Sequence, residues 1–287
     1  MHPTISPTLD TLTEINIDDL LDAMGLLRMR NTPVRRLLRP TARRFALIAD
    51  EFDARVGRHG LTPGSAWLMG RMTAGIRNSG LGHVPAQGPV IIVSNHPGMT
   101  DTVALFASLT SRPDLRVLAL DRPFLRALPN VARQLIFLSD DPAGQMAAVR
   151  AAARHLKEGG ALLTFPAGAI EPDPATFGAE RAQASLDRWS ASYALLARLA
   201  PRAQLVPALV SHVISSAAQR HPLARMRRKP DDREKAAAAL QVALPRYRDM
   251  VARVDFGAPT RAGDSPALDA AVAARMRQLI QATAGVH

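Results

Sequence analysis

Apolar and polar positions follow two different rhythms along this chain. From Ile15 to about Arg77, apolar residues recur every three or four positions, which predicts helices and no convincing strand. After Gly80, short apolar runs rich in β-branched residues alternate with helical patterns. The runs cover residues 89–94, 115–120, 134–139, 161–166, 205–210 and 252–257. The helices between and after them are predicted at 101–110, 144–158, 180–199, 232–250 and 266–281.

This alternation predicts an α/β fold with a largely parallel central sheet flanked by helices. We therefore divide the chain into a helical N-terminal extension, residues 1–80, and an α/β domain, residues 81–287. The first 12 residues are rich in Pro and Thr and are expected to form a loose tail. In parallel sheets, sites form in the loops that follow the carboxyl ends of strands, so a site is expected after one or more of these runs.

Composition narrows the range of partners. The 287-residue chain has a net charge of +11, and only Lys157, Lys229 and Lys235 among its cations are lysines. An arginine-biased genome explains this charge, and so does attraction to membrane headgroups, a phosphorylated substrate or nucleic acid. Only 12 residues are aromatic, and none is interleaved with a basic cluster, so stacking on nucleic acid is not expected. There is no cysteine, which rules out a disulfide and a thiolate metal site and suits a reducing cytoplasm.

The extension carries a concentration of charge. Residues 28–58 hold nine arginines against Asp50, Glu51 and Asp53. A basic amphipathic helix of this kind is typical of a surface that lies on an anionic bilayer, but it also fits the solvated face of a helical cap. No run of about 18 apolar residues predicts a transmembrane helix, and the N-terminus lacks the pattern of a secretory signal. We expect a cytoplasmic protein bound peripherally to the inner face of the membrane.

Candidate chemistry follows the first apolar run, in "PVIIVSNHPGMTD", residues 89–101. His96 comes directly after the predicted strand, and Asp101 stands five positions later, at the start of a helical pattern. A neutral imidazole accepts a proton from a hydroxyl or amine, and a carboxylate on its other nitrogen fixes the tautomer and stabilises the imidazolium. The spacing alone is weak evidence, because a histidine that merely caps the next helix gives the same pattern.

The surrounding blocks resemble the phospholipid/glycerol acyltransferase family. "SNHPGMTD" is similar to its first block, Asn-His followed by four residues and Asp. "VLALDRPFLRALPNVARQLIFLSDD" resembles the approach to the second block, and "LKEGGALLTFPAGAIEPD" resembles the third. "QLVPALV" is similar to the fourth, and "RVDFGAP" resembles the late strand. The blocks stand in the family's order between residues 81 and 281.

The resemblance implies transfer of a fatty acyl group from acyl-CoA or an acyl-carrier protein to a lipid acceptor. His96 would be the general base and Asp101 the residue that orients it. The resemblance assigns substrate binding to Asn95, Gly98, Phe165, Pro166, Ala167, Gly168 and Arg133. It implies no cofactor beyond the acyl co-substrate. No metal site is expected either, because the chain has no metal-binding motif.

Two departures from the family pattern bear on the acceptor. The second block ends in Asp140-Asp141, where the family has a phosphate-binding arginine, and the third has Ala167 in place of a glutamate. Both changes argue against glycerol 3-phosphate and favour a neutral or amine-bearing lipid. Alternatively, Arg122, Arg126 or Arg133 binds a phosphate from another position.

Three other interpretations stay open. The altered blocks also fit a member of the family that binds lipid or acyl chains without catalysis. The net charge by itself fits a nucleic-acid-binding protein. His212, after the Val-Pro run, either lines the pocket or is a hydrogen-bonded structural histidine.

Overall fold

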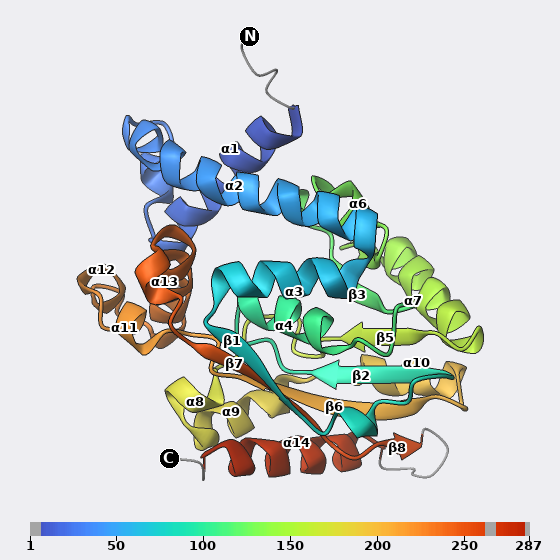
Figure 1. The fold of residues 1–287 in the computed structure, drawn as a ribbon. Coiled ribbons are helices and arrows are strands. Elements are labelled where there is room, and N and C mark those ends of the chain that lie inside the picture. The colour runs from blue at the N-terminus through green and yellow to red at the C-terminus, as the bar shows by residue number, and fades with distance from the viewer. Residues whose placement is uncertain (1–6, 262–267, 285–287) are drawn as a thin grey trace.

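A mostly parallel sheet forms the centre of the molecule in the computed structural model, which describes residues 7–261 and 268–284 (Figure 1). Its strand order is β1-β7-β6-β2-β5-β3-β4, with β8 paired to β6. Strands β6, β2, β5, β3 and β4 run parallel, whereas β7 and β8 are antiparallel to β6. The strands are β1 (Gly75–Ser79), β2 (Val90–Ser94), β3 (Arg116–Leu120), β4 (Leu135–Leu138), β5 (Ala161–Thr164), β6 (Gln204–Ser211), β7 (Val251–Phe256) and β8 (Thr260–Arg261). The predicted fold class is confirmed.

The six predicted runs all form strands, but the helical region ends earlier than expected. Helix α3 stops at Met72, and Gly75–Ser79 pairs in parallel with β7 at the edge of the sheet. The prediction of helix up to Arg77 is therefore wrong for this segment. Its side chains carry no alternating apolar signal because the strand lies half-exposed at an edge.

The long helices are α1 (Pro7–Ala23), α2 (Val34–His59), α3 (Leu61–Met72), α4 (Met99–Ser108), α7 (Pro142–Lys157), α9 (Ala179–Ser185), α10 (Ser192–Leu199), α13 (Pro230–Ala243) and α14 (Leu268–Ala284). Short helices lie between them: α5 (Pro123–Arg126), α6 (Pro129–Ala132), α8 (Pro174–Phe177), α11 (Ser216–Gln219) and α12 (Pro222–Arg225). The helix expected over 180–199 is interrupted at Leu186–Arg188. The expected tail is wrong for residues 7–12, which belong to α1, and its first six residues lie outside the described part of the chain.

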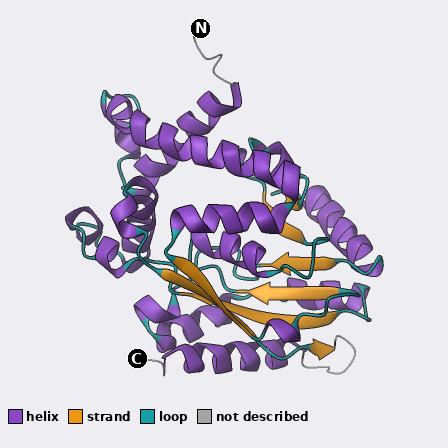
Figure 2. Ribbon diagram, in the orientation of Figure 1, coloured by secondary structure: helices purple, strands orange, loops and turns teal. Residues whose placement is uncertain are grey.

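Alternate residues of the buried strand β2 face two different helical layers (Figure 2). Val90 and Ile92 pack into the cluster built with α2, α3 and α4. Ile91 and Val93 pack into the cluster built with α7, α10 and α14. This period of two places a helical layer on each face of the sheet, which leaves the ends of the strands as the place for a site.

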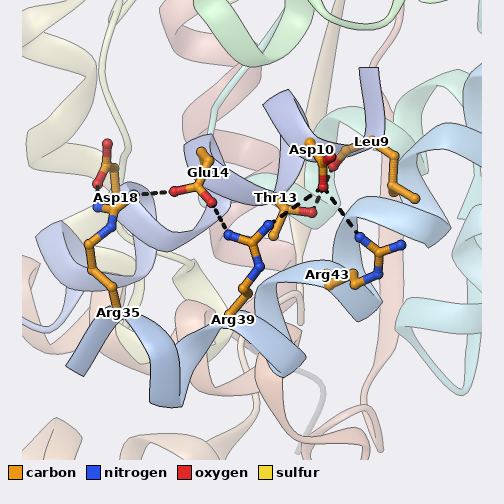
Figure 3. Close-up of polar contacts among 8 residues, drawn as sticks. All are labelled: Leu9, Asp10, Thr13, Glu14, Asp18, Arg35, Arg39 and Arg43. Carbon is orange, nitrogen blue, oxygen red and sulfur yellow. Dashed lines mark hydrogen bonds and ion pairs between the residues drawn. The ribbon is translucent and has the colours of Figure 1, made fainter. Parts of the chain in front are cut away.

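Ion pairs hold α2 against α1 (Figure 3). Arg35 pairs with Glu14 and Asp18, Arg39 with Glu14 and Asp10, and Arg43 with Asp10. Much of the basic stripe expected to face a bilayer is therefore neutralised within the helical region, and Arg55 and Arg58 likewise pair with Glu51. Among the described residues, no helix combines the length and apolarity required to cross a membrane.

Candidate active site

His96 lies in the loop that leaves the carboxyl end of β2, the central strand of the parallel region. Strand β2 is completely buried and stops at Ser94, because Pro97 cannot continue the ladder and the chain turns into α4. The arrowhead of β2 points to the side of the molecule where α8, α11 and α13 gather (Figure 1). The side chain of His96 keeps 29% of its surface exposed, so the ring is reachable from that side.

Asp101 holds the His96 ring. Its Oδ2 lies 2.7 Å from Nδ1 of His96 and accepts a second hydrogen bond from the N–H of Gly98, at 3.2 Å. The Asp101 side chain is fully buried, with 0% of its surface exposed. A carboxylate at Nδ1 places the proton there, so Nε2 carries the lone pair that accepts a proton from a substrate.

Electrostatics around the ring favour proton uptake. Burial by itself lowers the pKa of His96, but the charge and hydrogen bond of Asp101 and the charge of Glu171 outweigh burial and raise that pKa above its ordinary value. The imidazolium formed after proton abstraction is therefore stabilised by two carboxylates.

The main chain beside His96 is also fixed. The Asn95 amide accepts from the N–H of Val210 at 2.8 Å and donates to the C=O of the same residue at 2.9 Å. Because Val210 belongs to β6, this bridge ties the end of β2 to its neighbouring strand. Asn95 is buried and acts on the backbone, which is a structural role.

The loop after β5 runs beside the His96 loop. Val93 pairs with Thr164, so the following residues of the two strands leave the sheet at the same level. The ring of Phe165 lies 4.9 Å, between centroids, from the ring of His96. The chain then turns, with the N–H of Gly168 donating to the C=O of Phe165 at 3.1 Å and Gly168 at a φ of 62°, a conformation that favours glycine. The fold therefore brings Phe165, Pro166, Ala167 and Gly168 to the same end of the sheet as His96.

A narrow, largely apolar pocket adjoins the start of α4. Gly98 and Thr100 form part of its wall. The apolar remainder comes from α2, the end of α3, the segment after β6 and α13: Phe45, Ile48, Met72, Val213, Ile214 and Val242. The pocket thus lies between the helical region and the sheet, at the end where His96 is placed.

A protein-family model described as Acyltransferase matches residues 75–211, from the first residue of β1 to the last residue of β6. This segment is an acyltransferase-family domain. The resemblance inferred from the sequence blocks is therefore confirmed for this segment. A crystal structure of the 1-acyl-sn-glycerophosphate (LPA) acyltransferase PlsC from Thermotoga maritima is similar over 95% of this chain and 92% of that chain, with 13% identity and a TM-score of 0.42. Among curated proteins, no significant match was found.

Arg133, expected to bind substrate, is not brought to the His96 end of the acyltransferase domain. It is exposed and precedes β4, whose Leu135 lies at the level of Ile92 through the pairs with Val117 and Leu163. Arg133 is therefore roughly 15–20 Å back along the strand direction and three strand spacings, about 14 Å, to the side. Its side chain donates to Asn130 at 3.4 Å. This position does not support a contact between Arg133 and a substrate at His96.

The other two candidate arginines differ in availability. Arg126 is engaged by Asp121 through two hydrogen bonds of 2.8 Å, and its guanidinium stacks on Phe137. Arg122 is exposed just after the carboxyl end of β3, at the correct edge of the sheet but two strands from β2. Neither geometry places a guanidinium against His96.

The acidic end of the second block has a local explanation. Asp141 is the N-cap of α7 and accepts from the N–H of Gly144 at 2.8 Å, while Asp140 is exposed beside it. Asp141 therefore stabilises the helix start and is not free to serve as a substrate ligand. Within the described residues, no group of three or more His, Asp or Glu side chains forms a potential metal site.

Sequence reasoning missed one functional neighbour, Glu171. It lies four residues after Ala167, in the loop after β5, with 1% of its surface exposed, and its carboxylate contacts the backbone of His96. The sequence offered a signal, an acidic residue amid apolar and proline residues in "GAIEPDP". His212, by contrast, is half-buried at a φ of 58°, and its N–H donates to the buried Asp173, as expected of a structural histidine.

Proposed function

We propose that the protein is an acyltransferase that moves a fatty acyl group from a thioester donor, acyl-CoA or acyl-carrier protein, to a hydroxyl or amine of a lipid acceptor. The observation that carries this proposal is the hydrogen-bonded pair of His96 and Asp101 at the end of β2, inside the acyltransferase domain. The exposed ring and the apolar pocket beside it suit a substrate that is partly lipid.

The proposed reaction has two proton transfers. Nε2 of His96 takes the proton from the acceptor O–H or N–H as that atom attacks the thioester carbonyl carbon. The C–S bond then breaks, and the imidazolium returns the proton to the departing thiolate. Asp101 stays ionised throughout and stabilises the imidazolium, so it positions the base without exchanging a proton with the substrate.

The pocket lined by Met72, Val213 and Val242 is the proposed site of the acyl chain. It is apolar, and it opens beside Gly98 and Thr100, two and four residues after His96. A thioester carbonyl at His96 would direct its hydrocarbon chain into this space. Residues 167 and 140–141 offer no cation to an acceptor phosphate, which supports the proposal of a neutral or amine-bearing acceptor over glycerol 3-phosphate.

Peripheral membrane contact is proposed for the end of the helical region. The segment before α2 exposes Leu26, Leu27 and Met29, and Leu37 on α2 is 79% exposed. Around them Arg28, Arg30 and Arg36 are exposed and form no ion pair among the described residues. Exposed apolar side chains ringed by unpaired arginines suit an anionic bilayer.

A second exposed patch continues this surface. Met226, directly after α12, is 75% exposed, Leu223 is also exposed, and Arg225 and Arg228 stand beside them. Arg227 donates to the C=O of Met24 at 3.3 Å, so α12 lies next to the segment that begins the first patch. We name the two patches together, Leu26–Leu37 and Leu223–Arg228, the docking surface.

The proposal is tested by incubating the purified protein with acyl-CoA and with acyl-carrier thioesters in the presence of a total lipid extract, followed by mass spectrometry of the lipids. A new acylated lipid, absent with His96→Ala, identifies acceptor and chain together. Tight acyl-CoA or lipid binding without turnover on any acceptor would instead favour a non-catalytic lipid-binding protein.

A further inference from the structure

A buried carboxylate lies beneath the His96 loop, on a segment far from it in the sequence. Oε2 of Glu171 accepts a hydrogen bond from the main-chain N–H of His96 at 3.0 Å. In return, the main-chain N–H of Glu171 donates to the C=O of His96 at 2.8 Å. The two residues are thus joined by a reciprocal pair of hydrogen bonds between the loops after β2 and β5.

The second carboxylate oxygen of Glu171 is also fully engaged. Oε1 accepts from the indole N–H of Trp189 at 2.7 Å and from the hydroxyl of Ser185 at 2.9 Å. Each printed contact of this carboxylate brings a donor to an acceptor. The ionised form, which only accepts, satisfies all of them, whereas an amide would set its own N–H groups against other donors.

The peptide between Asn95 and His96 is consequently held from two sides. Asn95 bridges to Val210 on β6, and His96 is paired with Glu171 on the β5 side. With the main chain fixed, Asp101 fixes the ring. The direction of Nε2 then follows from three anchors on three different elements.

We propose that Glu171 is a positioning residue whose buried, ionised carboxylate fixes the main chain of His96 and so the aim of its Nε2, an inference that rests on the proposed function of His96. Glu171 touches neither the reacting atoms nor the acceptor in this arrangement. It acts through His96.

A positioning carboxylate differs from a merely structural one in its electrical effect on the ring. The charged groups that act on His96 are Asp101 from α4 and Glu171 from the loop after β5, and the charge of each raises the pKa of His96 against the lowering effect of burial. Asp173, two residues further on, is buried and faces the N–H groups of His212 and Val213. Removing the charge of Glu171 should therefore move the titration of His96 to lower pH.

The test is a titration followed by NMR on full-length protein with isotope-labelled histidine. The His96 signal is assigned by its absence in His96→Gln. In Glu171→Gln we expect its midpoint to move to lower pH, and in the matched control Glu180→Gln, an exposed glutamate on α9, we expect no movement. An unchanged midpoint in folded Glu171→Gln overturns the proposal.

Activity provides the second readout. Once an acceptor is known, Glu171→Gln should lower kcat about 10-fold or more with KM nearly unchanged, because the base is misaligned while the pocket is intact. The acid limb of the kcat profile should shift in the same direction as the NMR midpoint. A KM effect with wild-type kcat would contradict positioning.

Trp189→Phe keeps the test open if Glu171→Gln does not fold. It removes one donor from Oε1, which weakens the stabilisation of the ionised Glu171 and should again lower the His96 midpoint. No shift in this folded variant would also overturn the proposal. If His96 titrates as expected but no acceptor is ever acylated, the proposed function fails while the coupling between Glu171 and His96 stands.

Discussion

Nδ1 of His96 lies 2.7 Å from Oδ2 of Asp101, and that same oxygen accepts the N–H of Gly98 at the start of α4. One buried carboxylate therefore both stabilises the beginning of a helix and fixes the histidine tautomer. The five-residue spacing is what makes this possible, because it places Asp101 in the first turn of α4 while His96 still belongs to the strand exit.

Asp101→Asn tests this shared role. The substitution keeps the size of the side chain but removes its charge, so we expect turnover to fall roughly 100-fold or more. Because the charge of Asp101 raises the pKa of His96, its loss should shift the acid limb of the pH–rate profile to lower pH. Asp121→Asn, an exposed carboxylate after β3, is the control. Activity within threefold of wild type in Asp101→Asn would contradict the assignment.

Asn95→Ala should destabilise the fold. It leaves the buried N–H and C=O of Val210 without their amide partner, and we expect the free energy of unfolding to drop by about 2–4 kcal/mol. Urea unfolding followed by circular dichroism measures the change. Exposed Asn31→Ala serves as control, with an expected effect within about 0.5 kcal/mol. Equal stability of the two variants would show that the bridge between β2 and β6 contributes little.

Ala238→Phe on α13 fills the proposed acyl pocket. A longer side chain there shortens the space beyond His96, so we expect the preferred donor to change to a shorter acyl chain, with kcat on that chain largely retained. The measurement is competition among acyl-CoA donors of different length. Ala151→Phe, on the exposed face of α7, should leave the preference unchanged. An identical chain-length profile in both variants would place the acyl chain elsewhere.

The docking surface predicts salt-sensitive binding to anionic vesicles. Leu37→Glu combined with Met226→Glu puts two carboxylates among the unpaired arginines and should reduce co-sedimentation with phosphatidylglycerol vesicles several-fold. Met146→Glu, on α7, carries the same chemical change at an exposed site away from the surface. If all three substitutions weaken binding equally, the surface is not the contact.

Much of the architecture could be predicted from the sequence because buried parallel strands are written as continuous apolar runs. Residues 90–94 are all buried, and their run stood out from the helical background. The edge strand β1 escaped prediction for the opposite reason: "GIRNS" is polar and is held by pairing with β7, a contact that no local pattern encodes.

The candidate site was predictable only as far as contacts were local in sequence. His96 and Asp101 meet across five residues, so their pairing could be expected from a strand exit and a helix start. Glu171 meets His96 across 75 residues, through the parallel register of β2 and β5. Arg133 was misplaced because order in the sequence does not tell which end of a strand a residue occupies.

The most direct test of the account is the turnover of His96→Ala, measured on the acceptor found for the wild-type enzyme, with folding checked by thermal unfolding. We predict a folded protein whose acyl transfer is reduced by roughly 100- to 10,000-fold. Wild-type turnover in a folded His96→Ala would contradict the central claim that this imidazole removes the acceptor proton.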